Sequence, residues 1–288
     1  MKRNIFDIVN NIRKPSLEIS RIDRLLNQQN GVYVGNELFT DFMDGTPISI
    51  IDYIDQYLFK SWCQRGTCIN CDDFEISLNI SYIPEDDEEV TQDFIIIYCE
   101  YAANMIYLIK QKILSKDTLT NVVSATEKNI EKFLDWYNYE LKYFPKEEKV
   151  LVVPKNAYST SVAENIENES LSYSIIEYNH HLLQGDIEKK KAILLALGSD
   201  LEPHRKEIKT INKNLEDSIF FMLNNLDLRH NNRKKGDKNY NEKVAKMKKS
   251  NLEKWYDELY QLILAAYILI DNKARMVEIN NLKTEITT

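Results

Sequence analysis

Glycine and proline are scarce in this chain, with 7 Gly and 6 Pro in 288 residues. Folds rich in β-structure need a turn every few residues, and those turns rely heavily on these two residue types. Long stretches of the chain must therefore be helical. We expect an all-α fold, a multi-helix bundle in two helical lobes with little or no β-structure. A hydrophobic content of 43% is enough for a sizeable buried core.

Long apolar runs are also missing. The longest, such as residues 262–270, are far shorter than the roughly 20 residues that cross a bilayer. The first seven residues contain no apolar stretch of the kind found in signal peptides. We expect a cytoplasmic protein with no membrane partner, in which the cysteines are reduced thiols.

The motifs of common catalytic classes are absent. The chain has no glycine-rich phosphate loop, no serine nucleophile elbow and no His/Glu zinc-protease motif. Cys63, Cys68 and Cys71 offer three sulfurs at close spacing, but a structural zinc site needs four ligands and no histidine lies nearby. We therefore expect no metal and no other cofactor.

Charge is unevenly distributed. The whole chain has a formal net charge of −8, which argues against a protein that coats nucleic acid non-specifically. Residues 229–249 nevertheless contain nine Lys and Arg against two acidic residues, a local formal charge of +7. Any contact with a polyanion is expected to involve this segment, which is called the basic segment below.

Apolar periodicity predicts where the long helices lie. They are expected at residues 90–114, 118–143, 161–183, 203–226 and 251–270. A shorter helix is expected at 187–197, ended by Gly198, and the chain after Lys273 is expected to fray. Residues 150–154 (VLVVP) are the one convincing β-like run.

The segment around Pro145 interrupts the helical pattern and marks a domain boundary. We expect an N-terminal helical domain at residues 1–145 and a C-terminal helical domain at 158–288. The apolar face of the last helix is expected to form the C-terminal core against Phe220, Phe221 and Leu223. The residues of that face are Trp255, Leu259, Leu262, Ile263, Ala266 and Tyr267.

All four histidines lie in the C-terminal half, and histidine is the usual general acid or base near neutral pH. His180 and His181 are adjacent, so in a helix their side chains point about 100° apart and only one can face a site. Glu177 lies four residues before His181 and shares its face in a helix. That spacing fits either a carboxylate that orients the imidazole or an ordinary surface pair.

The end of the predicted 203–226 helix leads into Arg229, His230, Asn231 and Asn232. Arginine offers a planar fork that fits phosphate, the neighbouring histidine can move a proton, and asparagine can orient either group or read a base. The same residues also suit an ordinary helix end, where cations favour the C-terminal dipole and asparagine favours a turn.

This helix end, with its helical context, resembles HEPN domains, all-α bundles common in bacterial abortive-infection and toxin–antitoxin systems. The family motif places a histidine four to six residues after an arginine at the end of a long helix. Arg229 matches that arginine by context, whereas His230 follows it directly, so the spacing departs from the family pattern. Four segments also look like a group of bacterial proteins with abortive-infection affinities: residues 65–67, 178–186, 201–203 and 228–232.

The resemblance implies a metal-independent endoribonuclease or RNA-handling protein of a phage-defence system, acting as a homodimer. It implies RNA, a cognate toxin or antitoxin, or a phage protein as partners. The implied catalytic residues are Arg229, His230 and Asn231. The implied substrate-binding residues are His180, His181, Asn232, Arg233, Lys234 and Lys235.

Two other classes of protein fit the same residues. One is a non-catalytic helical binding module, such as a phage sensor, an antitoxin or a protein-interaction subunit. The other is a purely structural helical protein whose basic segment is a solvated turn. Cleavage of RNA requires a proton carrier, a cation facing the phosphate and a positive approach surface. The nuclease hypothesis therefore predicts that Arg229, one of His180 and His181, and the basic segment lie close together.

Overall fold

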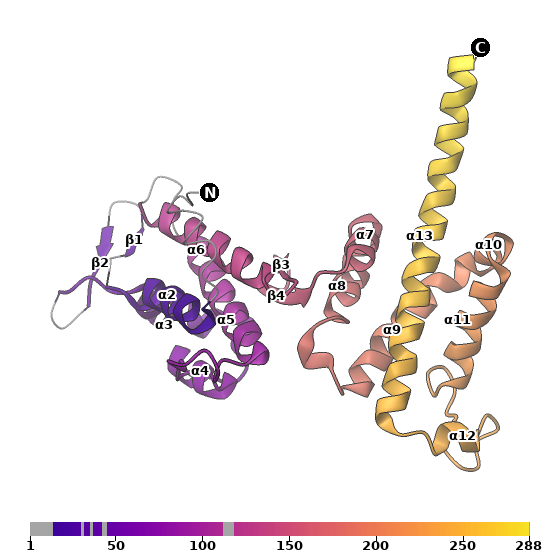
Figure 1. Cartoon of the computed structure of the whole chain (residues 1–288), viewed down its shortest axis with the longest axis horizontal. Helices are drawn as coiled ribbons and strands as arrows, with labels where there is room; N and C mark the ends of the chain where they lie inside the picture. Colours follow the sequence, from indigo (N-terminus) through magenta and orange to yellow (C-terminus); the bar gives the residue numbers. More distant parts are fainter. Residues whose placement is uncertain (1–13, 30–31, 35–36, 42–44, 112–117, 288) are drawn as a thin grey trace, which may run out of the picture. The chain divides into compact units, whose positions relative to one another are not determined.

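The fold is described from a computed structural model, which describes residues 14–29, 32–34, 37–41, 45–111 and 118–287. The chain forms two compact units, Met1–Lys155 and Asn156–Thr288, each with its own set of helices (Figure 1). The predicted mostly helical fold is confirmed. Among the described helices, none is both long enough and apolar enough to cross a bilayer.

The first unit consists of helices and two hairpins. Its helices are α2 (Pro15–Asn27), α3 (Ile50–Tyr57), α4 (Cys71–Leu78), α5 (Gln92–Lys110) and α6 (Thr118–Asp135), with the 3-10 turns η1 (Phe59–Ser61) and η2 (Cys63–Arg65). Its strands pair antiparallel, β1 (Val32–Val34) with β2 (Glu37–Phe39) and β3 (Tyr139–Phe144) with β4 (Lys149–Pro154).

Helix α5 is the centre of the first unit. Thr91 begins it by accepting a hydrogen bond from the Phe94 amide, and the helix then packs against α2, α3, α6 and β4. Its apolar residues occur around most of the helix rather than on one stripe, as expected for a helix that is covered on several sides. Cys99 is fully buried in it. Residues 112–114 of the predicted 90–114 helix lie outside the described residues.

The second hairpin corrects the predicted fold. The 118–143 helix ends at Asp135, and the chain turns at Asn138, whose φ is +62°, into β3. The predicted β-like run is indeed strand β4. β3 contains three aromatic residues and β4 contains three valines, and both residue types favour extended structure over helix. The expectation of little or no β-structure was therefore too strict.

Helix α5 holds the outer edge of β4. The side-chain amide of Asn104 donates to the carbonyl of Val150 at 2.8 Å and accepts from its N–H at 2.9 Å. One helical turn earlier, the carboxylate of Glu100 accepts from the Val152 N–H at 2.7 Å. The edge of the strand is thus satisfied by side chains of a helix.

The second unit contains helices and loops but no strand in its described residues. Its helices are α7 (Ala157–Asn165), α8 (Glu169–Glu177), α9 (Ile187–Leu201), α10 (Arg205–Ile211), α11 (Lys213–Asn225), α12 (Glu242–Ala245) and α13 (Lys249–Thr287), with the 3-10 turns η3 (His181–Leu183) and η4 (Glu202–His204). Helix α13 packs against α7, α9, α10 and α11 and so organises the unit.

The buried face of α13 differs in part from the predicted one. Leu259, Ile263 and Ala266 are buried as expected, whereas Trp255 is 45% exposed and Leu262 is only half-buried. The buried face shares these three residues with the predicted one and is completed by Leu252, Tyr256, Tyr260 and Leu264. On α11, Phe220 and Leu223 are buried, but Phe221 is 60% exposed and does not belong to the core.

Two of the predicted long helices are interrupted. The 161–183 helix is two helices, because Asn168 starts α8 by accepting hydrogen bonds from the Ser170 and Leu171 amides. The 203–226 helix is likewise divided, because Asn212 ends α10 and caps α11 through the Leu215 amide. Asparagine competes for backbone hydrogen bonds and favours such caps.

Gly198 does not end α9, contrary to the prediction. The helix continues to Leu201, and Gly198 is buried where α11 approaches. A Cβ at this position would lie 2.9 Å from both terminal methyl groups of Leu223. Glycine is therefore required here for close helix packing, at a cost in helix propensity.

The predicted fraying after Lys273 is also wrong. Helix α13 continues to Thr287, and its distal part extends beyond the other helices of the unit (Figure 1, yellow). Residues 272–287 are all exposed.

Candidate functional site

The predicted site begins where α11 ends. Leu226 and Leu228 are buried and anchor the chain on either side of Asp227, whose φ is +60°. The N–H of Arg229 then donates to the carbonyl of Leu223 at 2.9 Å, which closes the end of the helix. The positions of Arg229 and His230 are thus fixed by the helix end, as the sequence indicated.

Arg229 is held inside the unit. Its guanidinium lies 2.5 Å from the carboxylate of Glu202 and donates to the carbonyl of Gly198 at 3.1 Å. It also lies 5.4 Å from the centre of the Phe220 ring. Arg229 therefore joins the end of α9 to α11 and is only partly accessible.

A second arginine shares these partners. Arg205 lies 4.2 Å from the centre of the same Phe220 ring, 3.6 Å from Glu202 and 2.6 Å from the buried carboxylate of Glu216. The Glu216 hydrogen bond is the main reason that the pKa of Arg205 is raised. Two guanidinium groups and two carboxylates thus surround one aromatic ring, an arrangement suited to holding helices together.

Asn232 is a structural residue of the basic segment rather than one facing a ligand. Its side chain is 2% exposed, so the predicted substrate contact does not fit. Its side-chain oxygen accepts from the Asp227 N–H at 2.9 Å, and its side-chain nitrogen donates to the Asn239 carbonyl at 2.9 Å. Its main-chain carbonyl accepts from the Asn241 N–H at 2.8 Å. These bonds close the loop into a defined shape.

Arg233 also has a structural partner, because its guanidinium donates to the Met247 carbonyl at 3.2 Å. His230, Asn231, Lys234 and Lys235 are exposed, as a ligand-facing role requires. The basic segment presents seven exposed lysines in all: Lys234, Lys235, Lys238, Lys243, Lys246, Lys248 and Lys249. Lys246 pairs with Glu242, and the other six form no ion pair within the described chain.

His180 and His181 lie at the start of the 3-10 turn η3 and not in an α-helix, which overturns the argument that their side chains must diverge. His180 caps η3 by accepting from the Leu182 N–H at 3.4 Å, and the two imidazole rings lie 4.4 Å apart. His180 is buried and His181 is half-buried. Glu177 is bound by the Tyr173 hydroxyl and by Lys189 at 2.7 Å.

The structure does not bring the two histidines to Arg229. Arg229 binds the C-terminal end of α9, whereas η3 comes just before its N-terminal end. The two ends of α9 lie about 20 Å apart for a helix of 15 residues. Of the three expected catalytic residues, His230 and Asn231 are the exposed ones, and they precede Lys234 and Lys235 in the same segment.

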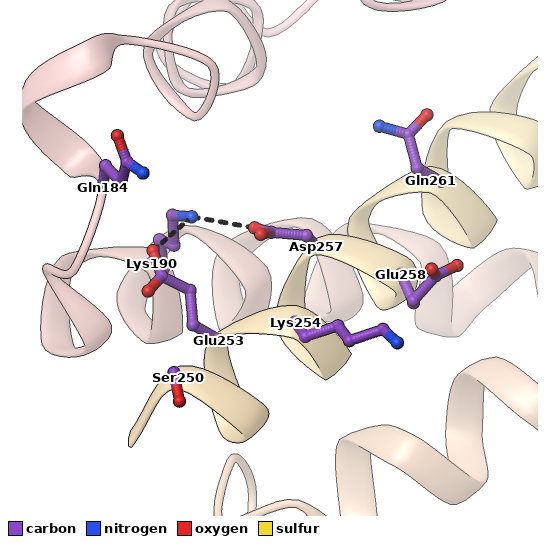
Figure 2. A pocket seen from close by; sticks show the side chains of 8 residues that line it. All are labelled: Gln184, Lys190, Ser250, Glu253, Lys254, Asp257, Glu258 and Gln261. Carbon is purple, nitrogen blue, oxygen red and sulfur yellow. Dashed lines mark hydrogen bonds and ion pairs between the residues drawn. The ribbon is translucent and has the colours of Figure 1, made fainter. Parts of the chain in front are cut away.

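A second candidate site is a charged pocket of about 470 Å³ between α9 and the start of α13 (Figure 2). Its deepest group is Lys190, whose side chain is 8% exposed. The Lys190 ammonium lies 2.8 Å from both Glu253 and Asp257, as the dashed lines in Figure 2 show. The other lining residues are Gln184, Ser250, Lys254, Glu258 and Gln261.

Lys190 also lies beside an aromatic ring that contacts one of its carboxylate partners. Its ammonium lies 5.3 Å from the centre of the Tyr178 ring, and the Tyr178 hydroxyl donates to Asp257 at 3.0 Å. Burial, followed by the charge of Asp257, raises the pKa of Tyr178. Burial alone would raise the pKa of Glu253, but hydrogen bonds from the Gly185 N–H and from Lys190 outweigh it and hold that pKa below its ordinary value. The two carboxylates thus balance the charge of Lys190, and their ion pairs join α9 to α13.

The sequence contains a signal for this buried lysine that was missed. Lys190 follows helical spacing with Ile187, Leu194 and Leu197, so it lies on the apolar stripe of α9, whereas the preceding Lys189 is exposed. Glu253 and Asp257 are four residues apart and share a face of α13. A lysine on an apolar face predicts carboxylate partners on the helix that covers it.

The three clustered cysteines have separate surroundings. Cys63 is exposed and lies near the Glu148 carboxylate, and Cys68 lies 3.6 Å from the Ser77 hydroxyl. Cys71 is buried, and burial followed by the charge of Asp55 raises the pKa of its thiol.

Comparison of the chain with protein-family models, with curated proteins and with solved structures finds no match. The function has to be inferred from the chemistry of these residues.

Proposed function

We propose that this protein binds RNA through its basic segment and does not cleave it. The observation that carries the proposal is the set of exposed lysines on the basic segment, whose first part is fixed in shape by buried Asn232. Six of these lysines form no ion pair within the described chain and so are available to phosphates. A fixed loop loses less conformational entropy on binding than a disordered tail would.

RNA suits this surface better than a generic acidic partner. The exposed His230, Asn231 and Tyr240 adjoin the lysines in sequence and offer hydrogen bonds and a ring for stacking on bases. The resemblance to HEPN domains adds RNA as the ligand class. Because the whole chain carries a net charge of −8, contact is confined to this segment.

The geometry favours binding over cleavage. Arg229, which would stabilise charge on the phosphoryl oxygens, is engaged by Glu202 and the Gly198 carbonyl. Within the described chain, no side-chain hydrogen bond orients the His230 imidazole. A hydrogen-bonded partner commonly sets the tautomer and direction of a histidine that acts as a general base. A role in phage defence, with a cognate toxin, antitoxin or phage protein, is part of the proposal on the resemblance alone.

Binding to a labelled single-stranded RNA should be measured as a function of salt concentration. The triple variant Lys234→Glu, Lys235→Glu, Lys238→Glu should weaken binding strongly and lower the salt slope by about 2, since each lost phosphate contact contributes roughly 0.7. The matched control places the same three charge reversals at Lys206, Lys209 and Lys213, which are exposed on α10 and α11. Equal loss of binding in both triple variants would contradict the proposal.

The same RNA should remain intact during these titrations. Cleavage by the unmodified protein that is lost in both Arg229→Ala and His230→Ala would establish the nuclease instead. Absence of any salt-sensitive RNA binding would leave the basic segment as a solvated turn.

A further inference from the structure

The distal part of α13 carries an apolar stripe that nothing in the described chain covers. Met276, Ile279, Leu282 and Ile286 are between 42% and 74% exposed. Their spacing of three or four residues places them on one face of the helix. These residues belong to the distal part of α13, which extends beyond the other helices of the unit (Figure 1).

Three residues of the stripe follow a heptad pattern, and Met276 flanks them at position e. With Ile279 and Ile286 at position a, Leu282 falls at position d and Asn272 occupies the preceding a. A β-branched residue at a with leucine at d favours a parallel pair of helices, and a single asparagine at a fixes register and the number of strands. Arg275, at the intervening d position, is paired with Asp271 on its own helix, so the continuous apolar seam is short.

Two charged residues beside the stripe, Glu278 and Lys283, indicate which helix can bind it and in which orientation. Glu278 falls at position g and Lys283 at position e, and neither forms an ion pair within the described chain. They are five residues apart, so they point about 140° away from each other and cannot pair within one helix. In a parallel, in-register pair of the same helix, position g of one chain faces position e of the next heptad in the other. An antiparallel pair would bring position g of one copy near position g of the other, which sets glutamates against each other.

We infer that residues 272–286 of α13 bind the same segment of a second copy of this chain, as a short parallel two-stranded coiled coil. Two Glu278–Lys283 ion pairs flank the seam, one on each side. Because the seam covers only about two heptads, the dimer is weak and its population depends on protein concentration. The inference is independent of RNA binding, since the basic segment, residues 229–249, shares no residue with the segment 272–286.

Sedimentation equilibrium of the full chain over a wide concentration range tests the inference. A reversible monomer–dimer equilibrium is expected, and the double variant Ile279→Glu, Leu282→Glu should be monomeric. Both residues are exposed in the monomer, so its thermal unfolding should be unchanged. The matched control is Val277→Glu, which lies on the same helix at 57% exposure but off the stripe, and which should still dimerise.

Charge reversal and cross-linking test the orientation. Glu278→Lys and Lys283→Glu should each weaken the dimer at least several-fold, and the two together should restore it. In a Cys63→Ser background, Ile279→Cys should form a disulfide-linked dimer on mild oxidation, because a positions face each other in a parallel pair. A chain that is monomeric at every concentration overturns the inference and assigns the stripe to another occupant. A dimer that survives Ile279→Glu, Leu282→Glu, or that Val277→Glu also dissociates, overturns it equally.

Discussion

The guanidinium of Arg229 and the carboxylate of Glu202 lie 2.5 Å apart and fix the point at which the basic segment leaves α11. Both side chains are partly exposed, so water screens the attraction. The contribution of the pair to stability is therefore modest. Its main effect is to position the start of the basic segment, because the residues that follow Arg229 include the exposed lysines.

Breaking this pair should lower the stability of the second unit. Arg229→Ala and Glu202→Gln are each expected to cost about 1 kcal/mol, with a coupling energy of about 0.5–1 kcal/mol in a double-mutant cycle. Urea unfolding of the four proteins measures it. The same cycle on the more exposed pair Lys246 and Glu242 should give a smaller coupling energy. Equal coupling in both cycles would show that the Arg229 pair has no special role.

Removing the buried lysine should be more damaging. Lys190→Ala leaves Glu253 and Asp257 without their common cation and is expected to cost about 3 kcal/mol. Lys190→Met keeps the apolar stem and should cost less. Adding Glu253→Gln and Asp257→Asn to Lys190→Met should recover part of the loss, because it removes the two unpaired charges. Denaturant midpoints check the order, and Lys254→Ala, on the exposed rim of the pocket, is the control.

Acid should weaken the second unit partly through Glu253. Its pKa is held below the ordinary value of 4.5 in the folded protein. Its carboxylate therefore contributes stability that is fully present above pH 4.5 and is lost as pH falls through the lower folded-state pKa. Glu253→Gln should flatten the loss of stability over that acid range, whereas Glu258→Gln, at the exposed rim, should leave it unchanged. Identical pH profiles for both variants and the parent would contradict the assignment.

The close contact of α9 with α11 should make Gly198 intolerant of a side chain. Alanine gains about 1 kcal/mol of helix propensity but must displace the buried methyl groups of Leu223, at a cost of about 1–3 kcal/mol. Gly198→Ala should thus be destabilising on balance, and Leu223→Val should reduce that penalty in the double variant. Ser199→Ala, at the next and exposed position, should not destabilise the helix. A stabilised Gly198→Ala protein would show that the helices can separate freely.

Much of the helical content could be predicted from the sequence, because few glycines and prolines interrupt the apolar periodicity. The errors have local causes. Asn168 and Asn212 cap new helices within segments whose apolar pattern continues without a break. Gly198 serves packing rather than termination, which depends on a residue of another helix. The end of α13 is helical although it buries nothing, since adding turns to an existing helix requires no new nucleation.

The site could be predicted only in part. Exposure of Lys234 and Lys235 follows from their charge, and the helix end at Arg229 follows from its context. The partners of Arg229, Asn232 and Arg233 could not be read from the sequence, since each contact joins residues separated by a turn or by whole helices. An arginine predicted to face a phosphate and one that faces a carboxylate look the same in a sequence.

The hydrogen bonds from α5 to β4 have a consequence for solubility. An open strand edge offers a row of unpaired amides and carbonyls on which a strand of another molecule can assemble. The Asn104 side chain occupies both main-chain groups of Val150, and Glu100 occupies the amide of Val152, so the apolar strand β4 presents blocked positions instead of a template. Helix α5 thus prevents β4, the most β-prone stretch of the first unit, from pairing edge to edge with other molecules, the association that leads to amyloid-like aggregates.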